Sequence, residues 1–94
     1  MKRMELIANH SVEEELVNVL ERRIKNFYYT IIPNVHGRGK SAYRMGTATW
    51  PEENFMVISY LNDHDARAAE ALVKDVKLRF PGEGIKLFFM NNDG

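Results

Sequence analysis

The chain has 94 residues, a length that suits a single folded domain spanning 1–94, and 45% of the residues are hydrophobic, which is enough for one shared core. Its 13 basic and 13 acidic residues leave no net charge to attract phosphate backbones or anionic lipid, so we expect no nucleic-acid partner. The absence of cysteine excludes disulfides, thiol nucleophiles and thiolate zinc sites, and it fits the cytoplasmic location that we expect.

The first elements predicted are a strand and a helix. The short apolar run 4–8, bounded by Asn9, indicates a largely buried strand. Ser11 and Glu14 have the spacing of a capping box, which predicts that a helix begins at Ser11. Apolar residues recur at helical spacing as far as Ile24, and they are Val12, Leu16, Val19, Leu20 and Ile24 itself.

A second strand and a long loop follow. Aromatic and β-branched residues at 27–32 predict a strand that ends near Val35. Because Pro33 cannot donate to both neighbouring ladders, we expect this strand at a sheet edge or with a bulge at Pro33. Residues 36–53 contain several glycines and little periodicity, which is typical of a functional loop in so small a domain.

The second half of the chain repeats the pattern. The run 55–61 predicts a strand, and Asn62 is a suitable cap for a helix whose apolar residues recur as far as Phe80. The segment 81–84 contains proline and two glycines, so it should end that helix. The run 85–90 predicts the last strand, followed by a polar end that we expect to fray.

This order of elements favours one topology. Two βαβ units with right-handed crossovers that share a sheet give an α+β fold, the ferredoxin-like plait, with order βαββαβ and antiparallel sheet order 4-1-3-2. The second and fourth strands are then the edges. Both glycine-rich segments, 36–40 and 82–84, should meet at one end of the sheet, and the turn at 62–64 should lie at the other.

These two glycine-rich segments are the candidate ligand site. Glycine allows successive backbone amides to approach an anion, and basic side chains stand beside the first segment. The proposed ligand-binding residues are Gly37, Arg38, Gly39, Lys40, Gly82, Glu83 and Gly84. The alternative, about equally favoured, is that these glycines only shape a turn and a helix end.

Histidines suggest a second kind of site, because imidazole is a common ligand of transition metals. His10 and His36 follow the first two predicted strands and are the candidate metal ligands, whereas His64 should lie at the opposite end of the sheet. The third strand separates the first two strands by about 10 Å. A site built from His10 and His36 would therefore need a neighbouring subunit or a movement of the loop.

The sequence gives little support to catalysis or to RNA binding. Ser11 is better explained as a helix cap than as a nucleophile, and no Gly-x-Ser-x-Gly motif is present, so we expect no enzyme activity. RNA-recognition domains share the predicted element order, but they stack bases on aromatic residues of the central strands. The first strand of this chain has no aromatic residue.

The segment Val35-His36-Gly37-Arg38-Gly39-Lys40 and the more loosely matching segment 80–85 resemble the two glycine-rich loops of PII signal-transduction proteins. The resemblance covers nearly the whole chain and is greater to divergent PII-like proteins. It implies a non-enzymatic regulatory homotrimer that binds a small-molecule effector in clefts between subunits. It also implies that the loop 36–53 is mobile and that its part 41–53 contacts a partner protein, such as a membrane transporter.

A weaker resemblance, based on 31–35 and Trp50, is to the CutA-like divalent-cation-tolerance proteins, which are also trimeric plaits. It implies an alternative function, a metal-binding trimer that uses His36 or His10. A third hypothesis is a plain protein-interaction module that binds no small ligand. The sequence leaves the effector open between an adenine nucleotide and a divalent metal ion.

Overall fold

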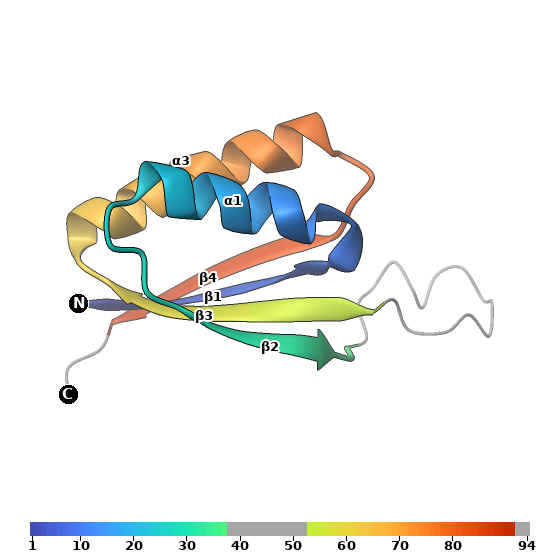
Figure 1. Ribbon diagram of the computed structural model, residues 1–94, viewed down its shortest axis with the longest axis horizontal. Coiled ribbons are helices and arrows are strands. Elements are labelled where there is room, and N and C mark those ends of the chain that lie inside the picture. The colour runs from blue at the N-terminus through green and yellow to red at the C-terminus, as the bar shows by residue number, and fades with distance from the viewer. Residues whose placement is uncertain (38–52, 92–94) are drawn as a thin grey trace.

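A four-stranded antiparallel sheet carries two helices on one of its faces in the computed structural model, which describes residues 1–37 and 53–91 (Figure 1). In chain order the elements are β1 (Lys2–Asn9), the 3-10 turn η1 (His10–Val12), α1 (Glu13–Arg23), β2 (Thr30–Val35), β3 (Asn54–Leu61), α3 (Asp63–Arg79) and β4 (Ile85–Asn91). The sheet order β2-β3-β1-β4 is the predicted order read from the other edge, so the ferredoxin-like plait is confirmed.

The register of the sheet sends alternate side chains toward the helices. β1 is central and pairs with β3 from Lys2 opposite Leu61 to Asn9 opposite Asn54. On the helix side of β1 the side chains of Met4, Leu6 and Ala8 are buried. This alternation is the period-2 pattern of a strand that has one face in the core.

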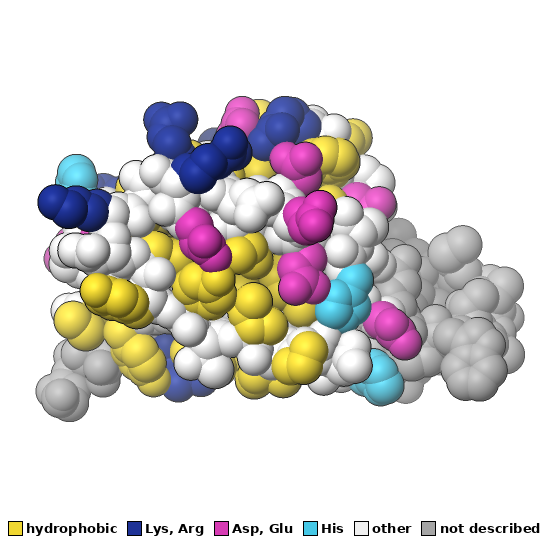
Figure 2. All heavy atoms as spheres, in the orientation of Figure 1, with side chains coloured by type: hydrophobic (Ala, Val, Ile, Leu, Met, Phe, Trp, Pro, Cys, Tyr) yellow, Lys and Arg dark blue, Asp and Glu magenta, His cyan; other side chains and the backbone are white. Residues whose placement is uncertain are grey.

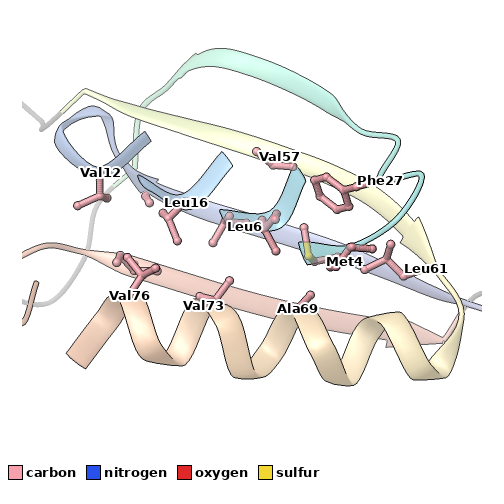
Figure 3. Close-up of a cluster of buried hydrophobic side chains, with 14 of the residues drawn as sticks. Met4, Leu6, Val12, Leu16, Phe27, Val57, Leu61, Ala69, Val73 and Val76 are labelled. Atoms are coloured by element: carbon pink, nitrogen blue, oxygen red, sulfur yellow. The ribbon is translucent and has the colours of Figure 1, made fainter. Parts of the chain in front are cut away.

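The core lies between the sheet and the helices, as the close-up in Figure 3 shows. Leu16 and Leu20 of α1 are fully buried against the sheet. The helix α3 contributes small and β-branched side chains, which are Ala66, Ala69, Val73 and Val76. Of the predicted core positions of this helix, Leu72 and Phe80 are only partly buried, and they pack against the edge of the core.

The start of α1 differs from the predicted capping box. The side chain of Asn9 accepts a hydrogen bond from the Ser11 amide at 2.9 Å and caps η1, and α1 begins only at Glu13. The cap position of α1 is Val12, which has no side-chain cap. The Ser11–Glu14 capping box is therefore wrong, because the asparagine at the end of β1 already caps the turn that leads into the helix.

The strand β2 begins at Thr30, later than predicted. Asn26 has a φ of 59°, so the chain turns sharply after α1. Phe27 is buried, and its ring stacks on the ring of Tyr29 with centroids 5.1 Å apart. The carbonyl of Tyr28 accepts a hydrogen bond of 2.6 Å from the buried hydroxyl of Ser59. Side-chain contacts thus hold the segment 27–29 in place of ladder hydrogen bonds.

Both expectations about Pro33 are confirmed. β2 is an edge strand, and its register with β3 shifts between Ile32, which is opposite Met56, and Val35, which is opposite Asn54. Two residues of β2, Pro33 and Asn34, therefore stand opposite the single residue Phe55. This is a β-bulge, a place where an edge strand tolerates a proline.

None of the helices in the described ranges covers the other face of the sheet (Figure 1). We call it the open face. Large hydrophobic side chains are exposed there, and they are Ile32, Tyr60, Phe88 and Met90. Among the described helices, none combines the length and the apolar character needed to cross a membrane.

Candidate functional site

The ends of several elements meet at one end of the sheet, which we call the loop pole. It comprises Asn9, His10, the segments 34–37 and 80–84, and Glu53. The Asn9 amide donates to the Gly84 carbonyl at 3.2 Å, and the His10 amide donates to the Glu53 carbonyl at 3.3 Å. These bonds join the end of β1 to the segments that lead into β4 and β3 (Figure 1). The second glycine-rich segment and the end of β2 thus lie at the same end of the sheet, and a contact between the two glycine-rich segments stays a prediction.

Four of the predicted ligand-binding residues are described, namely Gly37, Gly82, Glu83 and Gly84, and Arg38, Gly39 and Lys40 lie outside the described residues. Glu83 is partly buried, and its amide donates to the Phe80 carbonyl at 3.1 Å. This hydrogen bond closes the turn after α3. The Glu83 amide is therefore engaged within the chain and is not free to bind an anion in this arrangement.

The glycines of the loop pole are not required by the described part of the fold. A Cβ added at Gly37, Gly82 or Gly84 would meet no atom within 4 Å, and none of the three adopts a left-handed backbone conformation. The described chain could therefore accommodate a side chain at each position. The open space beside these glycines leaves room for a group from outside the described chain.

The described side chains of the loop pole are more acidic than basic. Glu53 and Glu83 belong to it, and Glu13 stands at the adjoining start of α1. Figure 2 shows acidic side chains and histidines together toward this end of the molecule.

His10 has the most elaborate contacts of the predicted metal ligands. Its Nδ1 lies 2.7 Å from Oε1 of Glu13, and its Nε2 lies 3.1 Å from Oδ1 of Asn34. The ring also packs at a tilt against the ring of Phe55, with centroids 5.9 Å apart. The hydrogen bond that the ring donates to Glu13 raises the pKa of His10 above its ordinary value of 6.5, desolvation opposes this, and the contact with Asn34 adds a smaller rise.

The described residues form no cluster of side chains that would support the metal hypothesis. Within 1–37 and 53–91, no group of three or more histidine, aspartate or glutamate side chains could hold a metal ion. His64 lies at the opposite end of the sheet from His10, since it follows β3 and Leu61 of β3 pairs with Lys2 of β1. A metal site at His10 or His36 stays a prediction.

A surface hollow of about 330 Å³ lies away from the predicted ligand-binding residues. It is lined by side chains of α1 alone, namely Glu15, Asn18, Glu21 and Arg22. Its lining has no residue in common with the glycine segments. This hollow therefore gives no support to the predicted ligand-binding residues.

The sequence singled out His10 as a candidate site residue, but its contacts with Glu13 and Asn34 were not predicted. The side chain of Asn34, which lies in the bulge of β2, contacts His10 although β3 stands between β2 and β1. The bulge itself was signalled by Pro33. Glu13 could have been found from its position three residues after His10, which places the two side chains on one side of a helical turn.

No family model matches this sequence, and no curated protein matches it. Solved structures do match, and they belong to a recognisable class of fold. CPII of Thiomonas intermedia K12, a nitrogen regulatory PII-like protein bound to ADP, AMP and bicarbonate, is 20% identical with a TM-score of 0.66, and the match covers 95% of this chain and 86% of CPII.

A PII-like signaling protein of Thermus thermophilus is also 20% identical, with a TM-score of 0.61, and the match covers 97% of this chain and 84% of that protein. A DUF3240 family protein of Shewanella baltica is 15% identical, with a TM-score of 0.52 and coverage of 99% and 90%. The chain is thus a ferredoxin-like plait, and more particularly it has the fold of the PII-like proteins.

Proposed function

We propose that this chain is a non-enzymatic PII-like regulatory protein that binds a small effector, of the adenine nucleotide class, at the loop pole. The observation that carries the proposal is the pair of hydrogen bonds from Asn9 to Gly84 and from His10 to Glu53, which assemble this pole. CPII, whose fold this chain shares, is bound to ADP and AMP. The effector is assigned to Gly37, Arg38, Gly39, Lys40, Gly82, Glu83 and Gly84.

The geometry of the glycines supports a ligand that approaches the backbone. Gly82 and Gly84 are exposed, with open space where a side chain would stand and no need for a left-handed conformation. A phosphate or a neighbouring protomer that approaches this backbone would be obstructed by a Cβ. The proposal therefore gives these glycines a role that the described fold does not.

The open face and the sheet edges support a homotrimer. Phe88 and Tyr60 are each about half exposed on the open face, at 49% and 50%. β2 and β4 are edge strands, whose unpaired backbone groups favour association with another chain. A closed trimer would cover these surfaces and would place the loop poles of neighbouring protomers next to one another, which is where the effector cleft is proposed.

Contact with a partner protein, such as a membrane transporter, belongs to the same proposal. The segment assigned to it, 41–53, lies outside the described residues except for Glu53. The support for this step is the resemblance of the sequence to PII proteins.

Calorimetric titration with ADP tests the effector assignment, with AMP as a second probe. We expect saturable binding to the full chain and at least tenfold weaker binding to Arg38→Ala, about the effect of losing a charge-assisted hydrogen bond. Arg67→Ala is the matched control, because Arg67 is exposed on α3 in its first turns, far from the loop pole. Absence of binding by the unmodified chain, or equal affinity in the two variants, would count against the proposal.

A further inference from the structure

His10 joins more elements than any other described polar side chain at the loop pole. Its ring contacts Glu13 at the start of α1 and Asn34 on the bulge of β2, and it packs against Phe55 of β3. Its backbone amide donates to the carbonyl of Glu53, the residue before β3. One residue thus holds the end of β2, the beginning of β3 and the beginning of α1.

The contact between His10 and Asn34 is made at the bulge in β2. In a regular plait, β3 separates β1 from β2 by about two strand spacings, or roughly 10 Å. The side chains of His10 and Asn34 span this separation, with Nε2 of His10 3.1 Å from Oδ1 of Asn34. Asn34 belongs to the bulge, where it and Pro33 stand opposite the single residue Phe55.

We propose that His10 is a positioning residue that fixes the ends of β2 and β3 relative to each other, and that the bulge at Pro33 and Asn34 serves to present Asn34 to it. Gly37 follows Asn34 by three residues, and Glu53 precedes β3 directly. The contact therefore sets the positions at which the chain leaves β2 and enters β3. This inference concerns the shape of the loop pole and does not depend on the proposed effector.

Amide hydrogen exchange, measured by NMR on the full chain, tests the proposal. In His10→Ala and in Asn34→Ala, exchange at Val35 and at residue 10 should become about fivefold faster, the factor that corresponds to one hydrogen bond of ordinary net strength. Exchange at Ile31, on the other side of the bulge, and at Asn9, whose amide donates to Gly84, should not change. His64→Ala, at the opposite end of the sheet, is the matched control.

Two further variants separate positioning from a general loss of packing. Asn34→Asp keeps an oxygen acceptor for the ring and should retain slow exchange, whereas Asn34→Leu keeps the bulk and should behave like Asn34→Ala. The double variant His10→Ala/Asn34→Ala should exchange no faster than His10→Ala alone, because His10→Ala already removes the contact with Asn34. The proposal is overturned if Asn34→Asp and Asn34→Leu exchange alike, or if the two single effects add.

Discussion

On the open face of the sheet, Arg3 donates from Nε to Oε2 of Glu5 at 2.9 Å. The same guanidinium donates to the hydroxyl of Tyr60 at 3.0 Å, and Glu5 raises the pKa of Arg3 above its ordinary value through its hydrogen bond. Glu5 stands between Ile58 of β3 and Phe88 of β4 in the register. Arg3 and Glu5 therefore pair within one protomer, while Lys86, which stands opposite Ile7 of β1, places a further charge on the same face. Covering the part of this face around Arg3 and Glu5 would leave neither of these two charges unpaired.

If protomers associate through the open face, Glu5→Lys should prevent assembly, because it removes the carboxylate that pairs with Arg3 and adds a cation to a face that already carries Arg3 and Lys86. Light scattering after size exclusion should give about three times the chain mass of 10.9 kDa for the unmodified protein and a single chain mass for the variant. Glu70→Lys, exposed on α3, is the control and should remain trimeric. A monomeric unmodified protein, or a trimeric Glu5→Lys variant, would contradict the proposed use of this face.

Two phenylalanines separate stability of the protomer from assembly. Phe55 is fully buried, so Phe55→Ala should lower the free energy of unfolding by about 3–5 kcal/mol. Phe88 is 49% exposed in the protomer, and Phe88→Ala should weaken stability mainly through loss of assembly, so its effect should depend on protein concentration. Urea unfolding at two protein concentrations distinguishes them. A concentration-independent loss of several kcal/mol for Phe88→Ala would show that Phe88 acts within the protomer.

The glycines of the turn before β4 should be dispensable for folding. Gly82→Ala and Gly84→Ala should leave the free energy of unfolding unchanged or raise it by about 0.4–1 kcal/mol, because a Cβ fits and the unfolded chain loses entropy. The same variants should bind ADP more weakly. Chemical denaturation and calorimetry check the two parts separately. Unimpaired ADP binding would remove these glycines from the effector site, and a loss of stability would mean that the turn needs glycine.

Stability should depend on the protonation of His10. Glu13 accepts a hydrogen bond from the His10 ring and raises its pKa above 6.5. Since the folded pKa exceeds the unfolded one, this contribution to stability is complete below about pH 6.5 and is lost as the pH rises through the folded pKa. NMR titration of the His10 ring measures the shift directly.

In Glu13→Gln the pKa of His10 should fall toward 6.5, and in the control Glu14→Gln it should not change, because the contact of the ring is with Glu13. A His10 pKa at or below 6.5 in the unmodified protein would show that the ring does not make this hydrogen bond in solution.

The fold could be predicted from the sequence because, in each half of the chain, the spacing of the apolar residues changes clearly between strands and helix. Alternating or continuous apolar runs indicated the strands, and the helical spacing from Val12 to Ile24 indicated α1. The predicted starts of α1 and β2 were wrong, because contacts of individual side chains decide where these elements begin. Asn9 took the capping role expected of Ser11, and the hydrogen bond from Ser59 to the Tyr28 carbonyl delayed the start of β2. Ser59 is 31 residues away from Tyr28, so such a contact leaves no signal in the local sequence.

The candidate site was predicted only in part. The topology brought the Gly84 segment to the end of β1, as the element order required. The role of His10 could not be found from its spacing to other histidines, because its partners are Glu13 and Asn34. Pro33 signalled the bulge in which Asn34 lies, but only the folded sheet shows that Asn34 contacts His10.

The most direct test of the central claim is to map ADP onto the chain by recording amide NMR spectra of the full protein during a titration. The account predicts saturable shifts at Gly37, Gly82 and Gly84, with no change at the turn of Asn62 and Asp63 at the other end of the sheet. Shifts confined to that turn, or no shifts at millimolar ADP, would contradict an effector site at the loop pole.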